Sequence, residues 1–163
     1  MRVGLGFDAH GFAAERVLVL GGVNIPASEG LAGHSDADVL SHAVADALIG
    51  AANLGDLGSM FPGDERWREA SSLDILRVAG TAVANAGYRV ANIDATVIAE
   101  RPRLAPYKED MAANIARALS LERKAVSVKA TSTDGLGFTG RGDGIAAMAV
   151  ALLESHPSAR PLE

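Results

Sequence analysis

The sequence predicts an α/β sandwich, in which helices cover one face of a mixed β-sheet, and three observations predict it. Apolar side chains at odd positions 3–9 alternate with Gly4, Gly6, Asp8 and His10, which is the period of a β-strand. From residue 39 onwards the apolar residues recur every three or four positions, which is typical of an amphipathic helix. After a hairpin near residue 22, the expected elements run helix, helix, strand, helix, strand, strand. This order favours one layer of helices on one sheet.

The composition indicates a single domain that spans residues 1–163. Hydrophobic residues make up 48% of the 163 positions, which is ample for one core. The net charge is −5 and the basic residues are scattered, which argues against a nucleic-acid partner. No apolar run reaches the roughly 20 residues of a membrane span, and no signal-peptide pattern opens the chain. We therefore expect a cytoplasmic protein.

The first strand places two candidate ligands side by side. Asp8 and His10 are two positions apart, so both point to the same face of the strand, roughly 6–7 Å from each other. Gly4 and Gly6 leave space on that face. The larger apolar side chains point to the opposite face: Val3, Leu5 and Phe7.

The helix that starts near residue 39 carries a third candidate ligand. Ser35 or Asp36 is expected to cap it. Asp38, His42 and Asp46 are four positions apart and share one helix face, away from the main apolar face. The simplest interpretation of that face is a solvated surface with one histidine on it.

A catalytic zinc site is the competing interpretation. Asp8, His10 and His42 would supply three nitrogen and oxygen ligands and leave a fourth position open. The chain has no cysteine, so a thiolate site is impossible. Asp38 or Asp46 would orient a liganding imidazole through its second nitrogen. Both interpretations stay open at this point, because nothing in the residue pattern shows that the strand and the helix meet.

The remaining segments form the scaffold and two loops rich in small polar residues. We expect a hairpin at 16–25, helices at 72–87 and 111–119, strands within 88–100 and at 125–131 and 145–153, and a flexible tail at 155–163. Residues 145–153 are apolar at every position, which predicts a buried strand covered by a symmetric homo-oligomer. Residues 131–134 offer three hydroxyls and a carboxylate, which suit phosphate and a hard cation but also suit a turn.

Five motifs together resemble the 2-C-methyl-D-erythritol 2,4-cyclodiphosphate synthase family. They are G-F-D-A-H at 6–10, G-H-S-D-A-D-x-x-x-H-A at 33–43, L-G-D-L-G-x-M-F-P at 54–62, A-T-S-T-D at 130–134 and G-F-T-G-R-G-D-G at 137–144. The resemblance implies a homotrimer that packs through its sheets, with active sites between adjacent subunits. It also implies a reaction of non-mevalonate isoprenoid synthesis, a cyclisation that releases CMP from 4-diphosphocytidyl-2-C-methyl-D-erythritol 2-phosphate.

The resemblance also assigns roles to residues. Zn²⁺ would be held by Asp8, His10 and His42, and Asp134, where the family more often has Glu, would help bind Mg²⁺ or Mn²⁺. His34 and Ser132 would stabilise the transition state as catalytic residues. The residues implied in binding substrate are Asp8, His10, His34, Ser35, Asp56, Gly58, Phe61, Asp64, Ala99, Arg103, Leu104, Ala105, Thr131, Ser132, Thr133, Asp134, Phe138 and Arg141.

Within this set the resemblance separates three regions. Asp56, Gly58 and Phe61 would contact the methylerythritol phosphate, and Asp64 lies in a neighbouring loop that departs from the family pattern. Residues 99–105 and 131–134 of the adjacent subunit would form the cytidine pocket. Phe138 and Arg141 would line a cavity on the trimer axis that takes an isoprenoid diphosphate.

Two other functions use the same residues. A zinc-dependent hydrolase would attack its substrate with a zinc-bound hydroxide. A trimeric nucleotide-binding module would use zinc only as a structural ion, with a protein side chain in the fourth position.

Overall fold

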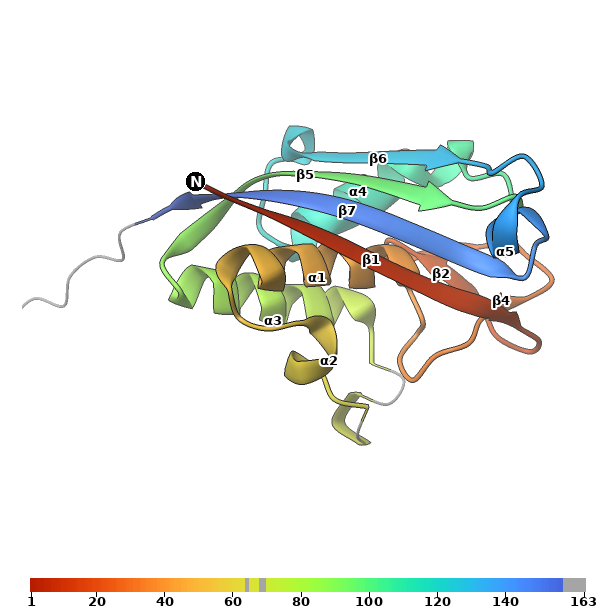
Figure 1. The fold of residues 1–163 in the computed structure, drawn as a ribbon, viewed down its shortest axis with the longest axis horizontal. Coiled ribbons are helices and arrows are strands. Elements are labelled where there is room, and N and C mark those ends of the chain that lie inside the picture. Colours follow the sequence, from red (N-terminus) through yellow and green to blue (C-terminus); the bar gives the residue numbers. More distant parts are fainter. Residues whose placement is uncertain (64, 68–69, 157–163) are drawn as a thin grey trace, which may run out of the picture.

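The core of the fold is a five-stranded sheet with the strand order β4-β1-β7-β5-β6 (Figure 1). A computed structural model describes residues 1–63, 65–67 and 70–156. Its five strands are β1 (Arg2–Ala13), β4 (Gly30–Leu31), β5 (Tyr88–Ile98), β6 (Val126–Thr131) and β7 (Gly144–Ser155). The β5–β6 pair is parallel and the other pairs are antiparallel. The predicted mixed sheet is therefore confirmed.

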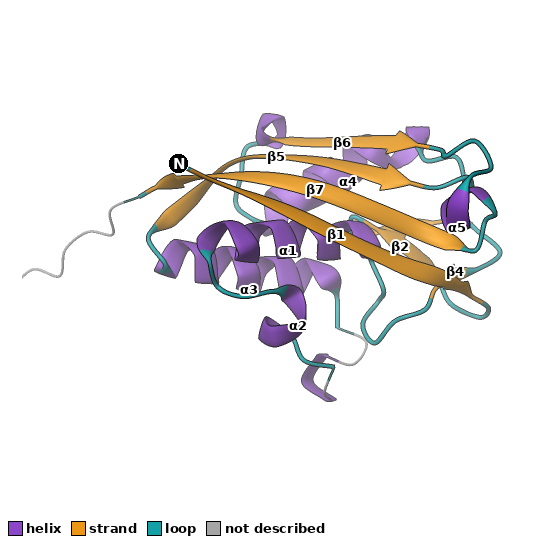
Figure 2. Cartoon of the chain, viewed as in Figure 1, coloured by secondary structure: helices purple, strands orange, loops and turns teal. Residues whose placement is uncertain are grey.

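Three helices pack on one face of this sheet (Figure 2). They are α1 (Val39–Ala52), α3 (Ser72–Asn85) and α4 (Lys108–Ala118). The predicted hairpin is present as β2 (Leu18–Leu20) and β3 (Val23–Ile25). Short helical turns complete the described chain: α2 (Leu57–Met60), α5 (Gly137–Gly140), Glu65–Trp67, Ala105–Tyr107 and Arg123–Ala125. In the described part of the chain, no helix is long and apolar enough to cross a membrane.

Strand β1 lies directly against α1, and its glycines make this approach possible. A Cβ atom on Gly6 would lie 2.0 Å from the carbonyl oxygen of Ala43 and 2.6 Å from the amide nitrogen of Ala47. The predicted alternation of β1 is correct. The face that is buried against α1 carries Gly4 and Gly6, whereas the face with the larger apolar side chains is exposed. This contact brings the Asp8 end of β1 next to α1.

Replacing Gly6 with alanine is expected to destabilise the protein by about 3–5 kcal/mol, because neither backbone can yield without separating strand and helix. Gly50→Ala is the matched control, because a Cβ there meets nothing within 4 Å and alanine favours a helix. The free energy of unfolding from urea denaturation measures both. A Gly6→Ala protein as stable as wild type would contradict the close packing of β1 on α1.

Helix α1 is buried on nearly all sides, which corrects the expectation of an amphipathic helix with one solvated face. Its N-cap is Asp38, not Ser35 or Asp36. The fully buried Asp38 carboxylate accepts hydrogen bonds from the backbone of Ser41 and from the backbone amides of Gly21 and Gly22 in the β2–β3 turn. Asp38 therefore joins the start of α1 to the hairpin.

The opposite face of the sheet carries exposed apolar side chains, which we call the open face. Val3, Leu5 and Phe7 on β1 are 68%, 61% and 55% exposed, and Met148 and Val150 on β7 are about 40% exposed. Strand β7 is therefore buried on one face only in the single chain, because its other face belongs to the open face.

The end of β7 differs from the expected tail at 155–163. Ser155 still pairs with Tyr88, and the backbone amide of His156 donates to the carbonyl of Gly87 at 2.8 Å. The rest of the expected tail, residues 157–163, lies outside the described residues.

Candidate active site

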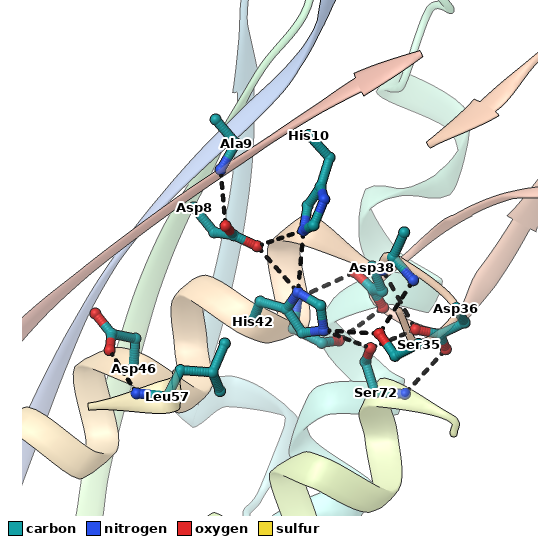
Figure 3. A network of polar contacts seen from close by, with 12 residues as sticks. Asp8, Ala9, His10, Ser35, Asp36, Asp38, His42, Asp46, Leu57 and Ser72 are labelled. Atoms are coloured by element: carbon teal, nitrogen blue, oxygen red, sulfur yellow. Dashed lines mark hydrogen bonds and ion pairs between the residues drawn. The ribbon is translucent and has the colours of Figure 1, made fainter. Parts of the chain in front are cut away.

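Asp8 and His10 from β1 and His42 from α1 point toward one another (Figure 3). The Asp8 Oδ2 atom lies 2.9 Å from both His10 Nε2 and His42 Nδ1, and the two ring nitrogens are 3.3 Å apart. His42 is only 7% exposed. The strand and the helix therefore meet as the zinc hypothesis requires, and the interpretation of His42 as part of a solvated face is wrong.

The donor set of this cluster fits a divalent cation. His10 Nδ1 lies 2.6 Å from the carbonyl oxygen of Ala32. Because a carbonyl only accepts, Nδ1 carries the proton, and Nε2 of the neutral ring turns a lone pair toward Asp8. The Asp8 carboxylate is also an acceptor. The lone pairs of His10 Nε2 and of the Asp8 carboxylate therefore point to the same place, and a divalent cation bound there would be coordinated by both.

The charges in the cluster depend on each other. When the two imidazoles are protonated and donate to the carboxylate, burial still raises the pKa of Asp8, but these hydrogen bonds and the ionic attraction from His10 and His42 outweigh burial and hold the pKa far below its usual range. In turn, the hydrogen bond to the Asp8 carboxylate raises the pKa of His10, although burial opposes it. A cation that binds here takes the place of the shared proton.

The carboxylates expected to orient His42 do not do so. Asp38 caps α1, and Asp46 accepts a hydrogen bond from the backbone amide of Leu57 at 3.1 Å. Two serine hydroxyls take this place. His42 Nε2 lies 3.1 Å from Ser35 Oγ and 3.0 Å from Ser72 Oγ (Figure 3).

Next to the cluster lies a cavity of about 200 Å³ with one polar and one apolar side. The polar side contains the three cluster residues together with His34 and Ser35. The apolar side is formed mainly by residues from the α2 region and α3: Leu57, Phe61, Pro62, Gly63, Trp67 and Ile75. Of the residues expected to contact the methylerythritol phosphate, only Phe61 is in this lining.

Trp67 was missed by the sequence reasoning, although it is the only tryptophan in the chain. Its ring packs edge-on against Phe61 with the ring centroids 4.8 Å apart. Its indole nitrogen is buried and has no hydrogen-bond partner among the described residues. Trp67 therefore belongs to the apolar side of the cavity through its ring.

The other expected site residues form a second cluster, away from this cavity. Strand register places Thr131 in one row with Ile98, Ala146 and Ala9. Three strand spacings therefore separate Thr131 from β1, or about 14 Å. Within one chain, the hydroxyls of 131–134 and the cation ligands lie apart.

Glu100, which was also missed, shapes this second cluster. Its carboxylate accepts hydrogen bonds from the backbone amides of Thr133 at 3.0 Å and Gly135 at 3.2 Å. Ser132 Oγ donates to Asp134 Oδ1 at 3.0 Å. The adjoining segment contains Ala99, Arg103, Leu104 and Ala105, and the amide of Ala99 donates to the carbonyl of Thr131.

The remaining expected residues lie on the surface. Asp56 is the exposed N-cap of α2, and Gly58 follows it in the same turn. Phe138 is 40% exposed on α5, and the exposed Arg141 just after it pairs with Asp143 at 3.0 Å. Asp64 lies outside the described residues.

Comparison with known proteins identifies relatives along the whole described chain. The protein named 2-C-methyl-D-erythritol 2,4-cyclodiphosphate synthase of Moorella thermoacetica is 60% identical over 154 residues, which are 94% of each chain. A solved structure of the bifunctional IspDF of Campylobacter jejuni superposes with a TM-score of 0.92 at 41% identity, covering 96% of this chain and 42% of that one. A CDP complex of IspF from Plasmodium falciparum gives a TM-score of 0.84 at 30% identity, covering 95% and 96%.

The match to a family profile covers residues 1–154. It spans both the cation cluster and the cluster around Thr131. The chain belongs to the YgbB family, together with the relatives named 2-C-methyl-D-erythritol 2,4-cyclodiphosphate synthase.

Proposed function

We propose that the chain converts 4-diphosphocytidyl-2-C-methyl-D-erythritol 2-phosphate into 2-C-methyl-D-erythritol 2,4-cyclodiphosphate and CMP. It would act as a cyclising phosphorus–oxygen lyase in non-mevalonate isoprenoid synthesis. The observation that carries the proposal is the convergence of Asp8, His10 and His42 beside a cavity, in a chain 60% identical to a protein named for this reaction.

The reaction needs positioning and charge neutralisation more than a base. The attacking 2-phosphate is already an anion at neutral pH, so no side chain has to remove a proton from it. Asp8, His10 and His42 would hold the proposed Zn²⁺, which when bound polarises the β-phosphate as a Lewis acid. His34, on the cavity wall, would donate to the phosphoryl oxygens, and the apolar side would exclude water.

The second half of the site would come from an adjacent subunit. In a homotrimer, Ser132 of one chain would face the cavity of the next chain and stabilise the transition state. Asp134 would help bind Mg²⁺ or Mn²⁺, and residues 99–105 would receive the cytidine. Two observations support this arrangement. The two clusters lie about 14 Å apart within one chain, and the open face carries exposed apolar side chains that a neighbouring subunit would cover.

Replacing Phe7 with glutamate is expected to break the assembly into monomers, because it buries a charge in the proposed interface. Val17→Glu is the matched control, since Val17 is 62% exposed but lies outside the open face. Sedimentation velocity distinguishes the two outcomes. A wild-type chain that sediments as a monomer would refute the homotrimer.

Phe138 and Arg141 are proposed to line an anion-binding cavity on the trimer axis. Three arginines around an axis repel each other, so a diphosphate between them relieves the repulsion. Farnesyl diphosphate is expected to raise the melting temperature by several degrees, and Arg141→Ala is expected to abolish this shift. An unchanged melting temperature of the wild-type protein would end the proposal.

Phosphorus NMR of the protein with substrate, Zn²⁺ and Mg²⁺ tests the proposed reaction. We expect CMP and a cyclic diphosphate to appear together. Linear phosphates would instead identify a zinc-dependent hydrolase. Tight binding of CMP without turnover would identify a nucleotide-binding module.

A further inference from the structure

His42 is connected to a carboxylate outside the cation cluster. Ser72, at the start of α3, is fully buried and places its Oγ 3.0 Å from His42 Nε2. The same hydroxyl donates a hydrogen bond to Asp36 Oδ1, and the Ser72 backbone amide donates to Asp36 Oδ2 at 2.9 Å. Asp36 and Ser72 are not among the residues that line the cavity. Figure 3 shows this chain on the side of His42 away from Asp8.

The direction of each hydrogen bond in this chain follows from proton counting. A carboxylate only accepts, and a serine hydroxyl has a single hydrogen. The hydrogen of Ser72 is committed to Asp36, so Ser72 Oγ can only accept from His42. Nε2 of His42 therefore carries a proton, and in the neutral ring Nδ1 turns its lone pair toward Asp8.

We propose that Asp36 and Ser72 are positioning residues that fix the tautomer and orientation of His42 and so set the affinity of the cluster for a divalent cation. The inference rests on the proposed cation site. It makes the cation affinity depend on α3, a helix that supplies none of the three proposed ligands. Ser35 Oγ, at 3.1 Å from Nε2, shares the same proton and supports the ring from a second side.

The first test compares two adjacent serines by titration with Co²⁺, followed by its visible absorption. Ser72→Ala is expected to weaken Co²⁺ binding about 10- to 100-fold. Ser71→Ala is the matched control, because Ser71 caps the same helix by accepting from the Leu73 amide, whereas the hydroxyls beside His42 Nε2 in the described part of the chain are those of Ser35 and Ser72. Ser72→Thr keeps the hydroxyl and is expected to restore binding.

Asp36→Asn provides the sharper test, because it changes one atom and preserves the volume. The asparagine oxygen replaces only one of the two carboxylate oxygens, one of which accepts from the Ser72 backbone amide and the other from Ser72 Oγ and the backbone amide of Asp38. When the asparagine oxygen faces the Ser72 backbone amide, the side-chain NH₂ turns toward Ser72 Oγ. The serine proton is then free to point at Nε2, which moves the imidazole proton to Nδ1 and into the cation site. We expect Asp36→Asn to weaken Co²⁺ binding at least as much as Ser72→Ala and to change the absorption spectrum.

The outcomes separate this inference from the proposed function. Unchanged Co²⁺ affinity in both Ser72→Ala and Asp36→Asn, with tight binding by the wild type, would overturn the inference and leave the proposed function intact. A wild-type protein that binds neither Co²⁺ nor Zn²⁺ would overturn both. Equal losses in Ser71→Ala and Ser72→Ala would also overturn the inference, because they would indicate a general weakening of α3.

Discussion

Coexpressed His42→Ala and Ser132→Ala chains are expected to recover about a quarter of wild-type activity, although each variant alone is nearly inactive. His42 belongs to the cation cluster and Ser132 to the second cluster, about 14 Å away across the sheet in the same chain. If each site combines one cluster from each of two adjacent subunits, hybrid trimers contain some sites in which both clusters are intact. Random assembly of a one-to-one mixture places about one quarter of the sites in that class.

The control mixes two defects from the same cluster. Asp8→Ala and His42→Ala both damage the cation ligands, so no subunit in the mixture can supply an intact cation cluster. Hybrids carrying two affinity tags should also be purified and assayed for CMP release. Their expected activity is about a third of wild type, because one site in three is intact once both homotrimers are removed. Failure of the His42→Ala and Ser132→Ala mixture to recover, or equal recovery in the control, would contradict a site shared between subunits.

His42→Ala alone is expected to reduce CMP release by at least about 1,000-fold, because the lost ligand would release the proposed cation that would polarise the phosphate. Zn²⁺ loaded onto the wild-type protein should survive dialysis, whereas Zn²⁺ added to His42→Ala should be lost. His156→Ala is the matched control, since His156 is exposed at the end of β7 and lies away from the cluster. Metal content by mass spectrometry and the rate of CMP release give the two readouts. Retention of zinc and activity by His42→Ala would exclude this ligand set.

The periodicity of the sequence predicted which residues share a face of a strand or helix, but it did not predict which of those faces is buried. The alternation of residues 2–10 placed Asp8 and His10 on one face correctly, because the strand period is a local property. It does not say which face of β1 is buried. The glycine face packs against α1, since only small residues allow the strand and the helix backbones to meet.

The residue pattern did not predict contacts between segments that are distant in the sequence. Ser72 touches His42 across 30 positions, and Asp38 caps α1 while it also binds the β2–β3 turn. Trp67 reaches the cavity by packing on Phe61. Such contacts depend on how whole elements pack, and no local spacing encodes them.

In the proposed reaction the phosphate of the substrate itself, and not water, attacks the diphosphate beside the cation cluster. The most direct test is to run the reaction in water enriched in oxygen-18 and analyse the products by phosphorus NMR and mass spectrometry. We predict CMP and a cyclic diphosphate, neither of which contains oxygen-18, because an intramolecular attack uses only oxygens of the substrate. Oxygen-18 in CMP or in a linear phosphate product would show that water is the nucleophile and would contradict the account.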